Sequence, residues 1–234
     1  MSTSLDLSTI IAEKIGVKNY FKEEFPKNQI YISHTASHPH PSFAIKKWVG
    51  SPYKVANCFA IAGKPYPSEN YYNDGQIHQC FNSKYWAIHL GLHAKRNEIP
   101  LSFKKKEVSR ILEKHSISIA LCNAGALSWE SGRFYSSFRK VIDEEDVIEY
   151  METFRGNRFY HRYTQAQIDS LKNILLYLNE LYGIPLEYKS EIWDISKSAL
   201  EGEKGIFTKC SVRSDVGSCH PQPELIEMLL SLKR

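Results

Sequence analysis

Short apolar segments that alternate with helical patterns constrain the fold of this chain most strongly. Patterns typical of buried strands occur at residues 29–33, 55–61, 76–81 and 116–123. The strongest helical pattern begins at Thr164, which has Gln167 as a capping-box partner, and its apolar stripe ends at Gly183. Strands that alternate with helices predict an α/β domain with one mixed central sheet, mostly buried and flanked by helices.

The remaining helical patterns are shorter. They lie at residues 42–49, with Ser42 as the cap, and at 106–114, 190–200 and 224–232. A further pattern within residues 5–25 predicts an N-terminal helix. Because no linker or internal repeat divides the chain, we expect residues 1–28 to form this helix and a lead-in, and residues 29–234 to form a single domain.

The composition is that of an ordinary globular protein. The chain has 234 residues, of which 42% are hydrophobic and 24% are charged. Its formal net charge of +4 is not gathered into long basic runs, so a nucleic-acid polymer is not an expected partner. No apolar run approaches the ~18 residues that a membrane span needs, so a membrane is not an expected partner either.

Cysteine usage and the N-terminus both bear on the cellular compartment. The five cysteines occur singly, at positions 58, 80, 122, 210 and 219. An odd number with this scatter favours free thiols in a reducing compartment. The N-terminus lacks the charged and apolar regions of a signal peptide, so we expect a cytoplasmic protein. A phage-encoded protein and a bacterial one would show the same features.

Four motifs are more specific than these patterns. They are Ser-His-Thr-Ala at 33–36, the segment from Asp74-Gly75 to Lys-Tyr-Trp-Ala-Ile-His-Leu-Gly at 84–91, the strand Ser-Ile-Ser-Ile-Ala-Leu-Cys-Asn at 116–123, and the loop 205–223 with His-Pro-Gln-Pro. Together they resemble the zinc-dependent N-acetylmuramoyl-L-alanine amidase family, which has the amidase-2 or peptidoglycan-recognition-like fold. The resemblance extends from Gln29 to the C-terminus and implies the same α/β fold.

The residues that carry the family's chemistry are replaced in this chain. The resemblance implies three zinc ligands, and their places hold Ser33, Lys209 and Ser218. Ala120 stands at the place of an acid/base Glu, and Val216 at the place of a catalytic Lys. An ammonium group repels a dication, and serine hydroxyls are weak zinc ligands. We therefore expect a catalytically inactive protein with no metal or other cofactor.

The resemblance also marks residues that could bind a ligand. They are Ser33, His34, Asn57, Trp86, His89, Lys209 and Arg213. The two cations, Lys209 and Arg213, suit a phosphate or a carboxylate. The predicted function is therefore binding of a small molecule in the former muropeptide groove, either a peptidoglycan fragment or an anionic metabolite such as a nucleotide signal.

A rearranged metal site is the alternative to this prediction. A shift of one residue would bring His34 to a metal, and Cys219 and His220 could complete the ligand set. The chain would then be an active zinc-dependent amidase that cleaves the lactyl-peptide amide bond of peptidoglycan. His38 and His40 are separated by prolines that keep the chain extended, so we expect them in a surface loop and not at a metal.

Overall fold

The computed structural model describes residues 7–13, 15–69, 71–92 and 106–232, and it contains two sheets. The central sheet has six strands in the order β1 (Ile11–Ala12), β4 (Ile77–Gln79), β3 (Phe59–Ile61), β5 (Ser116–Leu121), β2 (Gln29–His34) and β11 (Gly205–Thr208). β4 is antiparallel to β3, and the other neighbouring pairs are parallel. The prediction of a mixed central sheet is therefore confirmed.

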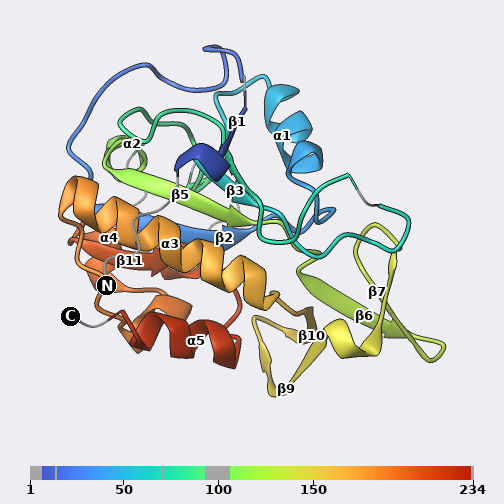
Figure 1. Cartoon of the computed structure of the whole chain (residues 1–234). Helices are drawn as coiled ribbons and strands as arrows, with labels where there is room; N and C mark the ends of the chain where they lie inside the picture. Colours follow the sequence, from blue (N-terminus) through green and yellow to red (C-terminus); the bar gives the residue numbers. More distant parts are fainter. Residues whose placement is uncertain (1–6, 14, 70, 93–105, 233–234) are drawn as a thin grey trace.

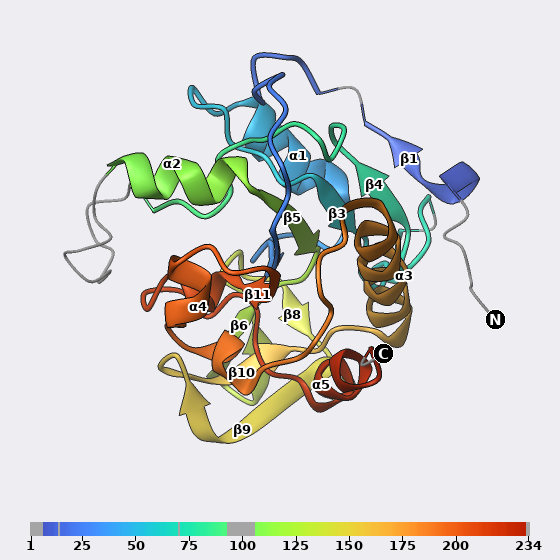
Figure 2. The same ribbon diagram turned by 90° about the vertical axis from the view of Figure 1, so that its left-hand side faces the viewer.

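Helices cover both faces of this sheet (Figure 1). α1 (Pro41–Val49) and α2 (Lys106–Lys114) lie on one side, and α3 (Gln165–Tyr182) runs along the other with α5 (Pro223–Leu230) beside it. The segment 190–200, predicted as one helix, is divided into the 3-10 turn η4 (Ser190–Trp193) and the short α4 (Lys197–Leu200) near β11 (Figure 2). This arrangement confirms the α/β class.

The two faces of the central strands differ in chemistry. Side chains alternate along a strand, so Ile30 and Ile32 of β2 share one face and Tyr31 and Ser33 share the other. The partners on β5 continue both faces, with isoleucines on the first and small side chains on the second. The first face therefore forms the apolar core, and the second leaves room for polar groups.

A second sheet follows β5 in the chain and was not predicted. Its antiparallel strands are ordered β8 (Val141–Ile142), β7 (Arg133–Tyr135), β6 (Ala126–Glu130), β10 (Asn157–His161) and β9 (Val147–Phe154). The 3-10 turn η3 (Glu144–Asp146) connects β8 to β9. The sequence indicated only irregular hairpins here, because these strands are short and mostly exposed, and their small core contains Leu127 and Ile142.

The N-terminal segment does not form the predicted helix, although its first residues lie outside the described part of the chain. Leu7–Thr9 form a 3-10 turn (η1), and Ile11–Ala12 pair with β4 as strand β1. The Glu13 N–H donates to the Gln79 carbonyl at 2.8 Å, and the Glu13 carboxylate lies 2.7 Å from His78 Nδ1. The unpaired backbone groups at the edge of β4 thus favour a strand over an isolated helix.

The helix starts show which capping predictions were right. At α3, the Gln167 N–H donates to Thr164 Oγ1 at 3.0 Å and the Gln167 side chain accepts from the Thr164 N–H, so the capping box is confirmed. Gly183 ends this helix with a φ of 63°, as a left-handed cap. At α1 the prediction of Ser42 as cap is wrong, because His40 Nδ1 accepts from the Ser42 N–H.

Several smaller predictions can also be compared with the structure. All five cysteines are buried and form no disulfide, as expected. His38 and His40 lie in the loop between β2 and α1, as expected, and both are half-buried. His38 Nε2 lies 2.9 Å from a Glu69 carboxylate oxygen. Within the described residues, no helix combines the length and the apolar character that crossing a membrane requires.

Candidate functional site

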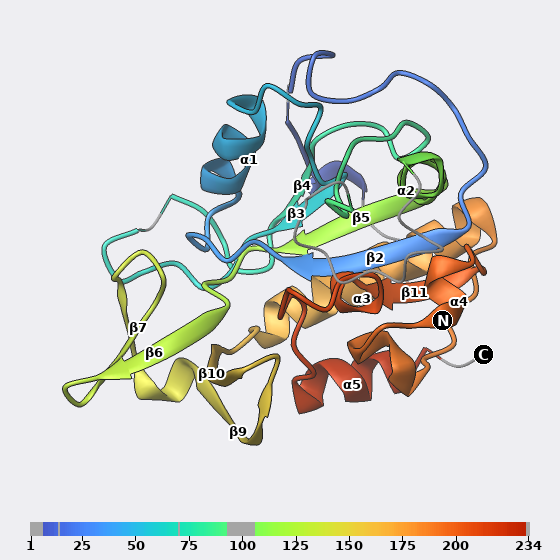
Figure 3. The ribbon, with the colours of Figure 1, turned by 180° about the vertical axis from the view of Figure 1, so that it is seen from behind.

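Three of the positions that the sequence resemblance assigned to metal binding and catalysis lie in one row across the central sheet. Thr208 of β11 is opposite Ile32 of β2, so Lys209, the next residue, follows beside Ser33. On its other side, Ser33 pairs directly with Ala120 of β5. β11, β2 and β5 run side by side in Figure 3. The structure thus brings together residues that are far apart in the sequence, as the expected site requires.

Lys209 is the charged member of this row. It is the first residue of the 3-10 turn η5 (Lys209–Ser211), and it is half-buried. Its amino group has no hydrogen-bond or ion-pair partner among the residues that the structure describes. Burial and the positive charge of Arg213 lower the pKa of Lys209 to about 8, while the carboxylates of Glu113 and Asp215 act in the opposite direction. The amine is therefore still mostly protonated at neutral pH.

Arg213 lies close to Lys209, but its charge is already paired. Its guanidinium donates two hydrogen bonds to the Asp215 carboxylate, at 2.9 and 2.6 Å. Nη1 also donates to the Leu90 carbonyl at 3.3 Å. A Cβ at Gly91, which has a φ of +69°, would lie 2.7 Å from Nη1, so this close approach depends on glycine. Of the two predicted cations, Lys209 alone lacks a counter-charge in direct contact.

His34 points away from the row. It follows Ser33 on β2, so the alternation of the strand directs it to the opposite face. There its Nδ1 lies 2.8 Å from the hydroxyl of Tyr163, the residue before the α3 cap. Burial, with smaller effects from Lys209 and His161, lowers the pKa of His34 to about 3, so the ring is neutral. His34 and Lys209 therefore do not share one ligand site.

Ser218 is held against β2 by both hydrogen-bonding functions of its hydroxyl. The His34 N–H donates to Ser218 Oγ at 3.0 Å, and Oγ donates to the His34 carbonyl at 3.1 Å. The loop residue at the third expected ligand place is thus fixed beside β2. Its oxygen hydrogen-bonds the backbone of β2.

The residues present do not fit a zinc ion. The row contains an ammonium group and a hydroxyl where the family pattern has metal ligands, and no described group of three His, Cys, Asp or Glu side chains is arranged to hold a metal. The proposed rearranged set is not brought together as ligands either. His220 Nδ1 is 2.8 Å from the Tyr150 hydroxyl, Nε2 is 3.2 Å from the His161 carbonyl, and Cys219 is fully buried. We derive no metal chemistry for this site.

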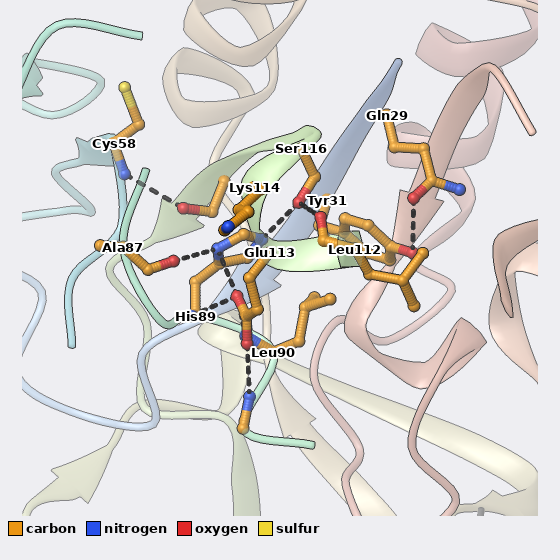
Figure 4. A network of polar contacts seen from close by, with 12 residues as sticks. Gln29, Tyr31, Cys58, Ala87, His89, Leu90, Leu112, Glu113, Lys114 and Ser116 are labelled. Carbon is orange, nitrogen blue, oxygen red and sulfur yellow. Dashed lines mark hydrogen bonds and ion pairs between the residues drawn. The ribbon is translucent and has the colours of Figure 1, made fainter. Parts of the chain in front are cut away.

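His89 belongs to a buried polar network on the same face of the sheet as Tyr31 (Figure 4). Its Nδ1 lies 2.9 Å from a Glu113 carboxylate oxygen and 3.0 Å from the Ala87 carbonyl. Its Nε2 lies 3.0 Å from Ser116 Oγ, which donates its only proton to the Leu112 carbonyl at 2.6 Å. Both ring nitrogens thus face hydrogen-bond acceptors, and Nδ1 lies within ion-pair distance of the Glu113 carboxylate.

Glu113 holds the segment around His89 in place. Its carboxylate accepts backbone N–H groups of His89 at 2.8 Å, Leu90 at 3.0 Å and Gly91 at 3.4 Å. Burial raises the pKa of Glu113, but the charge of His89 and these hydrogen bonds outweigh it, and the net effect is a lowered pKa. Glu113 therefore positions the loop whose Leu90 carbonyl contacts Arg213.

Trp86 and Asn57 occupy different surroundings. Trp86 is only 4% exposed, stacks on Phe21 with ring centroids 3.9 Å apart, and donates from Nε1 to Glu23 at 3.2 Å. Asn57 is half-buried just before β3, and its side chain has no hydrogen-bond partner in the described residues. Of the predicted ligand set, the structure gathers Ser33, Lys209 and Arg213, whereas Trp86 and His89 are packed inside the fold.

Two residues near the site were missed by the sequence reasoning. Glu113 lies on α2, where a charged residue is usually solvated, and Asp215 lies in the loop after β11. The sequence did contain a signal for Glu113, since a histidine in an apolar segment such as that around His89 needs a polar partner. No comparable signal in the sequence identifies Asp215 as the ion-pair partner of Arg213.

A comparison with known families identifies the family of this chain. The family model described as N-acetylmuramoyl-L-alanine amidase (amidase-2) matches residues 26–205, and the chain belongs to this family. No curated protein and no solved structure matches the chain. Family membership and the mixed central sheet thus agree on an amidase-2 fold.

Proposed function

We propose that this protein has lost the zinc amidase reaction and binds a small anionic ligand related to peptidoglycan beside Lys209. The observation that carries the proposal is the half-buried amino group of Lys209, which has no partner in the described part of the chain. It lies next to Ser33, at a place where the family pattern has a zinc ligand. The Lys209 ammonium thus provides a positive charge at the site, although the residues that would bind a metal are missing.

The loss of the zinc reaction follows from what that reaction needs. A zinc hydrolase requires three protein ligands and an open position where a bound water is activated. It also requires a base for that water. Here Ser33 and Lys209 replace two ligands, Ser218 is engaged with the backbone of β2, and the methyl side chain of Ala120 has no group that could act as a base. Several independent requirements are therefore unmet together.

Binding of an anion is supported by the surroundings of Lys209. An ammonium group in partly desolvated surroundings attracts an anion more strongly than one in water. Its donors are free among the described residues, and the neighbouring Ser33 hydroxyl likewise has no hydrogen-bond partner there. An incoming carboxylate or phosphate could accept from both groups. The family implies a peptidoglycan-related ligand, and peptidoglycan fragments carry carboxylates.

A binding assay and a hydrolysis assay test this proposal together. Muramyl dipeptide, N-acetylmuramoyl-L-alanyl-D-isoglutamine, should bind the wild-type protein in calorimetry and remain uncleaved in the presence of added zinc. Lys209→Met should weaken binding roughly tenfold or more, as for hydrogen bonds to a charged group. Lys47→Met, which removes an exposed charge on α1, is the matched control and should bind normally.

Two outcomes would contradict the proposal. Release of the dipeptide with zinc would show that the amidase reaction survives. Equal binding by the wild-type protein and Lys209→Met would place the ligand elsewhere.

A further inference from the structure

The charges that act on Lys209 limit the kind of anion that it can bind. Arg213 is paired with Asp215 through two hydrogen bonds, so this pair adds little net charge. Glu113 is likewise paired with His89 at 2.9 Å. Among the described residues around Lys209, these two pairs and the Lys209 ammonium leave one positive charge in excess. A ligand with one negative charge would neutralise the site, and a ligand with more would leave it negative.

The two carboxylates make an excess of negative charge costly. Both Glu113 and Asp215 act electrostatically on Lys209, and Glu113 is completely buried. A phosphate monoester carries a charge of about −1.5 to −2 at neutral pH, and polyphosphates carry more. Like charges in surroundings of low dielectric repel each other more strongly than in water. Phosphate groups therefore meet repulsion that a single carboxylate avoids.

The row also leaves little room beyond Lys209 and Ser33. Ala120, the neighbour of Ser33 on β5, is completely buried, and so is Ala60, the next residue across on β3. An anionic ligand can thus approach the row from the side of Lys209 and Ser33. Ser33 is 8% exposed. A flat group with two oxygens needs two donors, and Lys209 and Ser33 supply them.

From this we infer that the site beside Lys209 selects a monoanionic carboxylate, of the kind borne by a lactyl group or a peptide end, over phosphate esters and nucleotides. The inference rests on the proposed function and narrows it. It would exclude nucleotides, which the sequence left open as ligands. The carboxylate would accept from the Lys209 ammonium and the Ser33 hydroxyl while the rest of the molecule extends toward solvent.

Three sugars that differ in one group test this selection. N-acetylmuramic acid carries a lactyl carboxylate, its methyl ester is neutral, and N-acetylglucosamine 6-phosphate carries a phosphate. Titration of the full chain, followed by ligand-observed NMR, should show the acid binding roughly tenfold or more tightly than the ester and the phosphate. In Lys209→Met the acid should lose this advantage over the ester.

A second variant should reverse the preference. Asp215→Asn releases Arg213 from its counter-charge, so the site gains a second positive charge. The phosphate sugar should then gain roughly tenfold relative to the acid. Asp169→Asn removes an exposed carboxylate on α3 and should leave the preference unchanged. Thermal unfolding of each variant identifies any that do not fold.

The outcomes separate the inference from the proposed function. If the phosphate sugar binds the wild-type protein as tightly as the acid, and this binding depends on Lys209, the selection of a carboxylate is refuted while anion binding stands. If no sugar binds in a Lys209-dependent way, both are refuted. If Asp215→Asn folds but does not shift the preference, the charge balance is not the cause of selection, and the inference fails.

Discussion

Lys209→Met should make the folded protein more stable, although lysine is the natural residue. Lowering the pKa of the amine from 10.5 to about 8 means that the charged form is held in unfavourable surroundings. A tenfold change in proton affinity is worth about 1.4 kcal/mol, so the cost is about 3 kcal/mol, and the partial exposure of the side chain reduces it. We expect a gain of about 1–3 kcal/mol at pH 7.

The dependence of this gain on pH follows from the sign of the pKa change. Below about pH 8 the amine is charged in both the folded and the unfolded protein, so the full cost is present. Between about 8 and 10.5 the unfolded state binds more protons, and the stability of the wild-type protein rises with pH. The advantage of Lys209→Met should therefore shrink over this range. Asp215, Glu113 and Arg213, the charges that act on Lys209, are unchanged in the variant.

The assay is urea denaturation at pH 7 and pH 10, with free energies of unfolding from linear extrapolation. Lys27→Met is the informative control. Burial also lowers the pKa of Lys27 to about 8, but its Nζ donates to the carbonyls of Tyr85 at 2.9 Å and Lys114 at 2.7 Å. Its removal leaves those acceptors unsatisfied and should destabilise by about 1–3 kcal/mol. A Lys209→Met protein less stable than wild type at pH 7 would refute the view that Lys209 is desolvated without a partner.

The remaining predictions concern the polar network, the metal and the ligand. Glu113→Gln should lower the free energy of unfolding by about 3–5 kcal/mol, measured by denaturation, because it removes the buried carboxylate that pairs with His89 and accepts the backbone N–H groups of residues 89–91. Joint replacement of Ser33→His, Lys209→His and Ser218→Asp should give protein that retains zinc by elemental analysis, whereas the wild type should contain well under one equivalent. Binding of N-acetylmuramic acid should weaken as the pH rises through about 8, because Lys209 loses its proton there, and calorimetry across this range would show it.

Much of the fold followed from local patterns. The strand at 29–33 and the helix after Thr164 were predicted correctly, because periodicity and capping depend on residues near each other in the chain. The second sheet and the strand Ile11–Ala12 were not predicted. Each depends on a partner distant in sequence, such as the edge of β4, which no local pattern reveals.

The candidate site, like the fold, could be predicted only in part from the sequence. The sequence by itself determined which residue types stand at the family's metal and catalytic places, since Ser33, Lys209 and Ser218 can be read directly against the motifs. It also determined that Ser33 and its neighbour His34 point to opposite faces, because strand residues alternate. It could not determine which of these two faces belongs to the site.

Only the tertiary structure decided the charge of the site. From the sequence, Lys209 at the expected zinc place and the nearby Arg213 were both expected to act as cations toward a ligand. The fold placed Asp215 against Arg213 and left Lys209 half-buried, with no counter-charge in contact among the residues that the structure describes. The fold also places Glu113 of α2 in the core, beside His89. Pairing and desolvation arise from contacts between distant segments, and these contacts set the net charge that a ligand meets.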